Sequence, residues 1–261
     1  MKHKFQLLTI QLMGLYFIAG VFFPATGVSS MAIPDPESYF YAPIGSVWHY
    51  YGTTQDREIQ LTSENVFTNS ATAVKTMEKE GQQVIVFLET NPGNMGETES
   101  YYHIGDGGVI YYGSHPNQKF EESILPYSVV QFPLIEKKTF RQFHVENGNL
   151  FQDLDGDGIN EYVDAFADVT IGSLETVAVL AGTFHNVLRL DGKMEINVTM
   201  SSSGEVVITK DTLTSWFAPH VGLIKYIETI NVPIMGDVTV RTTVVTEELE
   251  EFRIMAPSLG N

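Results

Sequence analysis

Residues 205–230 read Glu-Val-Val-Ile-Thr-Lys-Asp-Thr-Leu-Thr-Ser-Trp-Phe-Ala-Pro-His-Val-Gly-Leu-Ile-Lys-Tyr-Ile-Glu-Thr-Ile. β-branched and aromatic side chains, which fit a pleated and half-buried surface, are frequent on both sides of this stretch. Its centre is interrupted by His220-Val221-Gly222, where glycine permits the backbone of a tight turn. The stretch therefore predicts two antiparallel strands, Glu205–Phe217 and Gly222–Ile230, joined as a hairpin.

The same pattern continues on both sides of this hairpin. Within Val238–Thr246 the β-branched residues are nearly continuous, which is typical of a long strand. Turns are expected at Asp191-Gly192, at Ser201–Gly204 and at Met235-Gly236-Asp237. The further strands predicted in this half are Glu175–Leu180, Phe184–Leu190, Lys193–Met200 and Val238–Phe252. From about residue 174 onward the chain therefore predicts a consecutive antiparallel meander.

The first half contains more loops but also predicts strands. These are Val47–Tyr51, Gln83–Glu89, Glu99–Ile104 and Val109–Tyr112. No convincing helical period with caps extends over a long stretch; the best helical candidate, residues 71–80, alternates in a way that suits a strand equally well. The predicted fold class is all-β, largely an antiparallel meander that forms a twisted sheet, a sandwich or a partly open barrel. No low-complexity linker divides residues 31–261, which indicates a single β-rich domain.

The N-terminus has the pattern of a secretory signal. Lys2 and Lys4 give a basic start, Leu12–Phe23 is apolar, and Pro24 ends that run before small residues begin. Residues 1–30 are therefore predicted to be a signal peptide, with export to the periplasm or the cell exterior. A membrane anchor is disfavoured because Gln11 and Gly14 interrupt the run, and residues 31–261 contain no second apolar run long enough to span a membrane.

The charge of the chain limits its partners. The full sequence has a formal net charge of −17, and removal of residues 1–30, which carry two lysines and no acidic residue, lowers this to −19. Such a charge argues against nucleic acid and against anionic lipid surfaces as partners. It fits an environment outside the cell in which divalent cations offset the repulsion. The chain contains no cysteine, so neither thiol catalysis nor a disulfide is possible.

Residues 153–164 read Asp-Leu-Asp-Gly-Asp-Gly-Ile-Asn-Glu-Tyr-Val-Asp and have the spacing of a calcium-binding loop. Gly158 occupies the sixth position, where the chain must turn sharply. Asp164 is shorter than the usual glutamate at the twelfth position, which favours a modest affinity for Ca²⁺. The predicted ligands are Asp153, Asp155, Asp157, the backbone carbonyl of Ile159, Glu161 (directly or through water) and Asp164. The alternative is an acidic surface turn without an ion.

The residues that flank the acidic loop do not predict the helices of an EF-hand. Residues 139–145 are β-prone, and Asn147-Gly148-Asn149 is a turn signal. The segment 153–164 therefore resembles the helix-free, EF-hand-like calcium loops of dockerins and thrombospondin type 3 repeats. It occurs once, which argues against a tandem array of such repeats.

Three phrases resemble a broad set of uncharacterised secreted or lipoprotein-type bacterial β-proteins. They are Tyr41-Ala42-Pro43-Ile44-Gly45-Ser46-Val47-Trp48-His49-Tyr50, Ala181-Gly182-Thr183-Phe184 and Ala218-Pro219-His220-Val221-Gly222-Leu223-Ile224-Lys225. In that set they match a Tyr-x-Pro-x-x-Gly-x-x-Trp-x-Tyr start, an Ala-Gly-Thr-Phe strand entry and an Ala-Pro-x-x-Gly-Leu-x-Lys hairpin. The resemblance implies an exported β-fold and no particular activity, and the lipidated cysteine of the lipoprotein members is missing here.

No catalytic residues are predicted from the sequence. The histidines are scattered, and neither a nucleophile elbow nor a phosphate-binding loop is present. Glu121-Glu122 would point to opposite faces if they lay on a strand, and Glu247–Glu251 is interpreted as a solvated strand edge. The leading hypothesis is an exported, calcium-binding, non-enzymatic domain that binds a protein or glycan or has a structural role at a surface. The alternatives are a carrier of an apolar ligand in a β-cavity and a secreted hydrolase with structural calcium.

Overall fold

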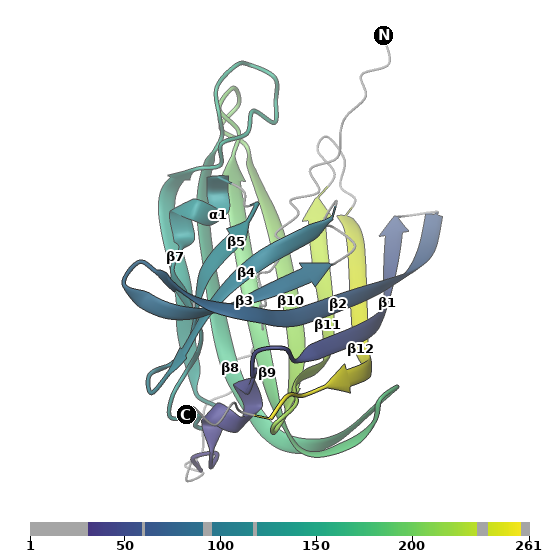
Figure 1. Ribbon diagram of the computed structural model, residues 1–261. Helices are drawn as coiled ribbons and strands as arrows, with labels where there is room; N and C mark the ends of the chain where they lie inside the picture. The colour runs from purple at the N-terminus through teal and green to yellow at the C-terminus, as the bar shows by residue number, and fades with distance from the viewer. Residues whose placement is uncertain (1–30, 59–60, 91–95, 117–118, 234–239, 257–261) are drawn as a thin grey trace.

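The computed structural model describes residues 31–58, 61–90, 96–116, 119–233 and 240–256 (Figure 1). The predicted signal peptide, residues 1–30, and the predicted turn at residues 235–237 lie outside these residues. The elements are η1 (Pro36–Phe40), β1 (Val47–Glu58), β2 (Leu61–Lys79), β3 (Gln82–Thr90), β4 (Glu97–Gly105), β5 (Gly108–His115), α1 (Lys119–Ile124), β6 (Tyr127–Gln131), β7 (Thr139–Asn149), β8 (Tyr162–Val179), β9 (Gly182–Thr199), β10 (Val206–Ala218), β11 (Gly222–Pro233) and β12 (Val240–Arg253).

The strands of the described residues form one antiparallel sheet of 12 strands. Their order is β6-β5-β4-β3-β2-β1-β12-β11-β10-β9-β8-β7. Each half of the chain is a meander, and the pairing of β1 with β12 joins the two halves. Figure 1 shows β2 and β3 crossing in front of β10 and β11, so the sheet curls back over itself. The predicted all-β meander is confirmed.

The two edge strands of the sheet come together on the far side from the β1–β12 pair. Gln142 Nε2 on β7 donates a hydrogen bond of 3.0 Å to the backbone oxygen of Ser128 on β6. The rings of Tyr127 and Phe143 lie 6.0 Å apart. The sequence allowed a twisted sheet, a sandwich or a partly open barrel, and the structure is a partly open barrel.

The hairpin predicted from residues 205–230 is present as β10 and β11. Gly222 and His220 both have positive φ, 93° and 61°, so the turn uses the backbone region that glycine tolerates best. A β-bulge lies between Trp216 and Phe217 and increases the local twist. A second tight hairpin joins β4 and β5 at Asp106-Gly107, as the turn-forming residues Asp106-Gly107-Gly108 between the predicted strands Glu99–Ile104 and Val109–Tyr112 indicate, and Gly105 is paired to Gly108.

The predicted turn at Ser201–Gly204 is confirmed between β9 and β10, whereas two other turn signals are wrong. Asp191-Gly192 lies inside the continuous strand β9, where Gly192 is buried opposite Leu213 and Val169. The dipeptide is accommodated in a strand because Asp191 points outward and its Oδ1 accepts hydrogen bonds from Arg189 and Thr214. Asn147-Gly148-Asn149 similarly belongs to β7, where it produces an irregular register rather than a turn.

Two ambiguous segments are also settled by the structure. Residues 71–79, the best helical candidate, belong to β2, in agreement with their alternation. Glu121 and Glu122 lie on the short helix α1 and not on a strand. Glu121 is buried and accepts a hydrogen bond of 2.8 Å from Tyr111 on β5, whereas Glu122 is exposed. The two side chains point in different directions, as expected, but because successive residues of a helix are rotated about its axis and not because of strand alternation.

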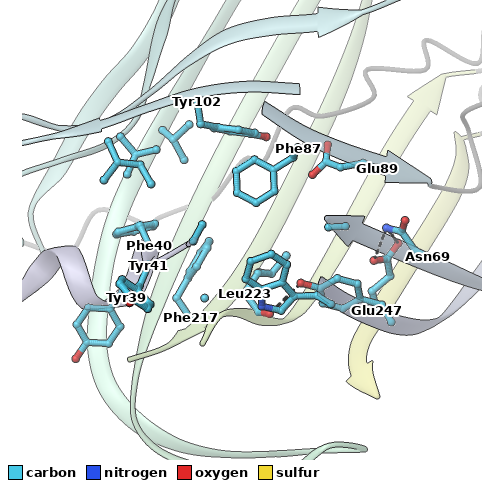
Figure 2. A pocket seen from close by; sticks show the side chains of 18 residues that line it. Tyr39, Phe40, Tyr41, Asn69, Phe87, Glu89, Tyr102, Phe217, Leu223 and Glu247 are labelled. Carbon is cyan, nitrogen blue, oxygen red and sulfur yellow. Dashed lines mark hydrogen bonds between the residues drawn. The ribbon is translucent and has the colours of Figure 1, made fainter. Parts of the chain in front are cut away.

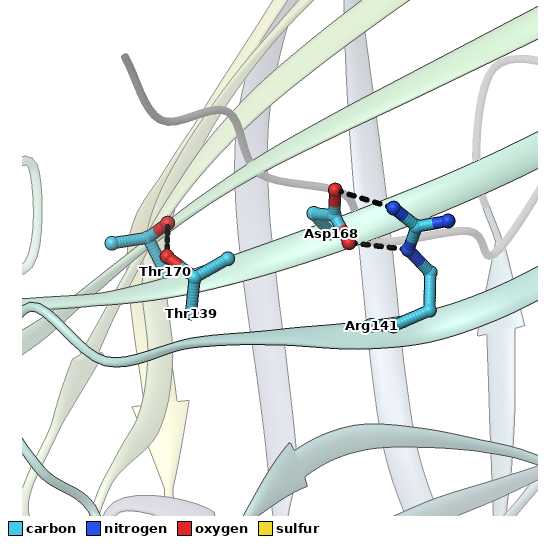
Figure 3. Close-up of polar contacts among 4 residues, drawn as sticks. All are labelled: Thr139, Arg141, Asp168 and Thr170. Carbon is cyan, nitrogen blue, oxygen red and sulfur yellow. Dashed lines mark hydrogen bonds and ion pairs between the residues drawn. The ribbon is translucent and has the colours of Figure 1, made fainter. Parts of the chain in front are cut away.

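The outer face of β7 and β8 shows how polar pairs fix the register at an edge. Figure 3 shows Arg141 beside Asp168 and Thr139 beside Thr170, each pair directly opposite in the register. Arg141 donates from both Nε and Nη2 to the Asp168 carboxylate, and the two threonine hydroxyls are 2.7 Å apart. Because these side chains are exposed, they specify the pairing more than they stabilise the fold.

Most of the core lies on the inner face of the curled sheet, and a small cluster of Val84, Val86, Tyr101 and Tyr112 is buried on the opposite face of β3–β5. The larger inner cluster contains Tyr111, Leu134, Ile171, Leu188 and Met194, all at most 2% exposed. A second cluster around Trp48, Tyr50, Ile224 and Leu249 lies beside the β10–β11 turn. η1 packs against this end of the barrel, where the backbone nitrogen of His220 donates to Ser38 O at 2.7 Å, and Phe40 contacts Phe217.

Gly52 on β1 generates the first testable prediction. It is buried, and a Cβ at this position would collide with the ring of Phe67 on β2. Gly52→Val is therefore expected to lower the free energy of unfolding by about 1–3 kcal/mol through overpacking. Thermal unfolding measures the effect. Gly107→Ala is the control because nothing lies within 4 Å of its Cβ position; equal stability of the two variants would contradict the packing argument.

Candidate functional site

A cavity lies inside the barrel, between the β10–β12 strands and the β1–β5 strands (Figure 2). Its volume is about 120 Å³, and it is partly open to solvent. This is somewhat less than the volume of a closed cavity that holds benzene, about 150 Å³, but the cavity is open on one side, so a ring can enter while the rest of a ligand stays outside. The lining residues are Tyr39, Phe40, Tyr41, Ala42, Trp48, Tyr50, Asn69, Ala71, Phe87, Glu89, Tyr102, Ile104, Val109, Val129, Phe217, Gly222, Leu223 and Glu247.

One part of the cavity wall is aromatic and rigidly held. The rings of Phe40 and Phe217 are 5.0 Å apart, and Phe87 contacts both Trp48 (6.0 Å) and Tyr102 (5.5 Å). Trp48 Nε1 donates to the backbone oxygen of Val221 at 2.6 Å. Aromatic rings in such tilted and edge-on contacts add stability beyond the area that they bury. The wall is therefore preformed.

The opposite part of the cavity is polar and acidic, as Figure 2 shows on the side of Glu89, Asn69 and Glu247. Asn69 Nδ2 donates to both carboxylate oxygens of Glu247, at 3.3 and 3.1 Å, and Tyr226 Oη donates to Oε1 at 2.9 Å. Burial raises the pKa of Glu247 to about 7; these hydrogen bonds lower it, and the nearby Glu89 raises it.

Glu89 lies deep in the barrel, yet it keeps an intermediate solvent exposure because it lines the open cavity. Burial raises the pKa of its carboxyl group, and the hydrogen bond from Ser100 Oγ lowers it. That bond goes to Oε2; no described residue donates a hydrogen bond to Oε1. Glu89 therefore presents one carboxylate oxygen that is not used within the described protein.

A second acidic pair, Asp211 and Glu228, lies further along the inner face. Asp211 is 2% exposed, and its Oδ1 has no hydrogen-bond partner among the residues that the structure describes. Burial raises the pKa of Asp211 and raises that of Glu228 well above its ordinary value, and the hydrogen bond between the two carboxyl groups lowers the first and raises the second. Glu228 is therefore the protonated partner and donates to Asp211.

The interpretation of Glu247–Glu251 as a solvated strand edge is wrong for Glu247. Strand β12 is paired on both sides, with β1 and with β11, so it is not an edge. Glu247 and Leu249 point inward and are 1% and 0% exposed, whereas Glu250 and Glu251 are exposed. The alternation of Val245, Glu247 and Leu249 was the signal in the sequence that could have indicated burial.

The acidic loop 153–164 is a separate candidate, on the surface at one end of β8. The structure brings three of its predicted ligands together, because carboxylate oxygens of Asp153, Asp155 and Glu161 all lie within 4.8 Å of one another. Glu161 is completely buried and accepts hydrogen bonds from the backbone nitrogens of Leu154, Asp155 and Ser201. The sharp turn predicted at Gly158 is present, with φ of 91°.

The other two predicted carboxylate ligands, Asp157 and Asp164, are not part of this group, and the backbone carbonyl of Ile159 stays a prediction. Asp157 accepts hydrogen bonds from the Ile159 nitrogen and the Ser201 hydroxyl, at 2.8 and 2.9 Å. Asp164 is the third residue of β8, and its Oδ1 accepts from the Asn147 nitrogen at 2.6 Å. Ile159 is exposed. The loop also docks on the turn between β9 and β10, where the hydroxyl and nitrogen of Ser202 hydrogen-bond to Asp155 and lower its pKa.

No protein-family model and no curated protein matches the chain. Among solved structures it is similar to a candidate exported protein with a YmcC-like fold from Bacteroides fragilis, at 13% identity and a TM-score of 0.35, and to a candidate lipoprotein from Parabacteroides distasonis, at 16% identity and a TM-score of 0.32. Each match covers 82% of this chain and 98% of the other. TM-scores this low do not establish a common fold. No helix among the described residues is both long and apolar enough to cross a membrane.

The Asp211–Glu228 pair predicts how stability depends on pH. Carboxyl groups whose pKa is raised on folding bind protons more tightly in the folded protein. Their contribution to the free energy of unfolding is therefore full below about pH 4 and is lost as the pH rises through the folded-state pKa. Glu228→Gln, which cannot ionise, is expected to flatten the loss of unfolding free energy between pH 5 and 8, by about 1.4 kcal/mol for each unit of raised pKa removed. Thermal unfolding across this range checks it.

The control for this prediction is Glu205→Gln, which changes an exposed carboxylate close to the start of β10. It should follow the pH profile of the unaltered protein. If the profile of Glu228→Gln also runs parallel to that of the unaltered protein, the buried pair does not govern this pH dependence.

Proposed function

We propose that this chain is an exported, non-enzymatic binding protein that holds an apolar ligand inside its barrel. The observation that carries the proposal is the aromatic cavity between the two halves of the sheet. Ligand sites are typically concave, mostly apolar and preformed, with few polar groups that fix orientation. The cavity has this composition, because aromatic rings such as Phe40, Phe87 and Phe217 surround it and only a few polar side chains reach it.

The position of the cavity supports the same function. Its walls come from η1 and from strands of both sheet halves, and the hydrogen bonds of Trp48 to Val221 O and of Tyr50 to Leu223 O (3.1 Å) fix β1 against the β10–β11 hairpin. A ligand that enters therefore meets walls that are already held in place, which reduces the entropic cost of binding. Export is proposed from the signal pattern of residues 1–30 and the acidic composition.

The ligand-carrier function is favoured over the calcium-organised binding surface because the acidic loop and the cavity consist of different residues. The loop 153–164 contributes no residue to the cavity lining. Its carboxylates are held by hydrogen bonds from the loop itself and from the turn at Ser201 and Ser202. Calcium is therefore proposed as a structural ion that stabilises this end of the protein. The hydrolase alternative remains a sequence-based hypothesis.

A cavity-filling variant tests ligand binding. Ala71 lines the cavity from β2, and Ala71→Phe is expected to occupy the space and lower the affinity for the uncharged dye N-phenyl-1-naphthylamine at least about tenfold, since the dye needs an empty apolar volume. Fluorescence titration measures the affinity. Thr68→Phe, at an exposed position of the same strand, is the matched control. Failure of the unaltered protein to bind the dye, or equal binding by both variants, would refute the ligand site.

The calcium proposal rests on the three grouped carboxylates, which supply hard oxygen ligands of the kind that Ca²⁺ prefers. Millimolar Ca²⁺ is expected to raise the melting temperature relative to EDTA, because an ion that binds only the folded state stabilises it. Asp153→Asn should lose this rise. The control is Glu146→Gln, at a side chain that is 78% exposed near the loop. An unchanged melting temperature of the unaltered protein in Ca²⁺ would mean that the loop is only an acidic turn.

A further inference from the structure

The acidic side of the cavity holds two carboxylates in fixed positions. Glu247 is oriented by Asn69 and Tyr226, and Glu89 is oriented by Ser100. They come from β12 and β3, and both line the same cavity. Buried polar groups at these positions do not contribute to an apolar core, and each carries a desolvation cost in its charged form. Two carboxylates placed in this way would be stabilised by a positively charged partner.

No such partner comes from the described protein. The groups that shift the pKa values of Glu89 and Glu247 are Ser100, Asn69, Tyr226 and the two carboxylates themselves, and no lysine or arginine of the described residues is among them. Burial raises the pKa of Tyr50, which lines the cavity too, and both carboxylates raise it further; burial likewise raises the pKa of Glu228, and Glu247 adds to that shift. The charged groups that line this part of the cavity are therefore the two acids, Glu89 and Glu247.

The aromatic rings beside the carboxylates complete the chemistry of a cation site. Trp48, Tyr50 and Phe87 line the cavity together with Glu89 and Glu247, as the close-up in Figure 2 shows for Phe87 and the two acids. The faces of aromatic rings attract cations, most strongly where water is excluded. A positive group here would be attracted by two carboxylates and by aromatic rings at once.

We propose that the ligand of the barrel cavity is an amphiphilic organic cation, with a protonated amine bound at Glu89 and Glu247 and an apolar ring or chain against Phe40 and Phe217. The proposal rests on the ligand-binding function proposed above and names its chemical class. Glu89 Oε1, which accepts no hydrogen bond from the described residues, is the acceptor for one N–H of the amine. An anionic ligand would be repelled, and a neutral ligand would leave the acidic side unpaired.

Three probes of equal ring size and different charge test the inference. Benzylamine is protonated at neutral pH, benzyl alcohol is neutral and benzoate is anionic, and NMR titration at pH 8 measures the affinity of the protein for each. Benzylamine is expected to bind at least about tenfold more tightly than benzyl alcohol, and benzoate is expected not to bind. Lowering the pH to 5 protonates Glu247, whose pKa is raised by burial to about 7, so the preference for benzylamine should decrease while benzyl alcohol binds unchanged.

Charge-removing variants locate the effect. Glu89→Gln and Glu247→Gln should each lower the affinity for benzylamine about tenfold and leave that for benzyl alcohol unchanged, whereas Glu251→Gln, an exposed position of β12, should change neither. The two substitutions lie on different strands, so one variant can still be used to measure the affinity for benzylamine if the other fails to fold. Preserved binding of benzylamine in the folded variants would overturn the inference.

The outcomes also separate this inference from the proposed function. If benzyl alcohol binds as tightly as benzylamine, and Ala71→Phe abolishes both, the cavity is a ligand site but not one for cations. If benzoate binds best, the assignment of charge is wrong. If none of the three probes binds and the uncharged dye does not bind either, the ligand-binding function itself is refuted.

Discussion

The pairing of β1 with β12 is the constraint on which the rest of the structure depends. Each half of the chain forms a meander by local hairpins, but only this long-range ladder, from Val47 opposite Arg253 to Arg57 opposite Thr242, makes them one sheet. Strands near the two ends of the chain thereby become the centre of the sheet order, and the edges β6 and β7 are left to meet on the far side. The barrel interior exists because this pairing forms.

The same pairing assembles the acidic side of the cavity. Asn69 on β2 lies opposite Tyr50, and Glu247 on β12 lies opposite Gly52, so one strand separates the two side chains. Neighbouring strands are about 4.8 Å apart, so a side chain on β2 can reach across β1 to one on β12. Asn69 does so and donates to both carboxylate oxygens of Glu247, while the ring of Phe67 occupies the space over Gly52. The β1–β12 pairing thereby brings together residues 178 positions apart.

The sequence predicts the parts of this fold that depend on local patterns. The β10–β11 hairpin follows from β-branched residues around His220 and Gly222, and the turn at Gly158 follows from the loop spacing. It does not predict that Asp191-Gly192 would remain in a strand, because turn residues are tolerated where the outward aspartate finds partners. The β1–β12 ladder carries no local signal and escaped prediction; a β-cavity was considered as one alternative, but the residues that line it could not be named from local patterns.

The acidic residues inside the barrel are where local rules and the fold disagree most. Glu89, Asp211, Glu228 and Glu247 occupy inward positions that a strand pattern usually reserves for apolar side chains, and burial raises the pKa of each. Exceptions of this kind are expected at functional sites, because the sequence keeps a destabilising group only where another requirement maintains it. Asp211 and Glu228 satisfy part of that cost between themselves by sharing a proton. Glu89 and Glu247 do not form such a pair; hydrogen bonds from Ser100, Asn69 and Tyr226 offset part of the cost of their burial, and both side chains face the cavity.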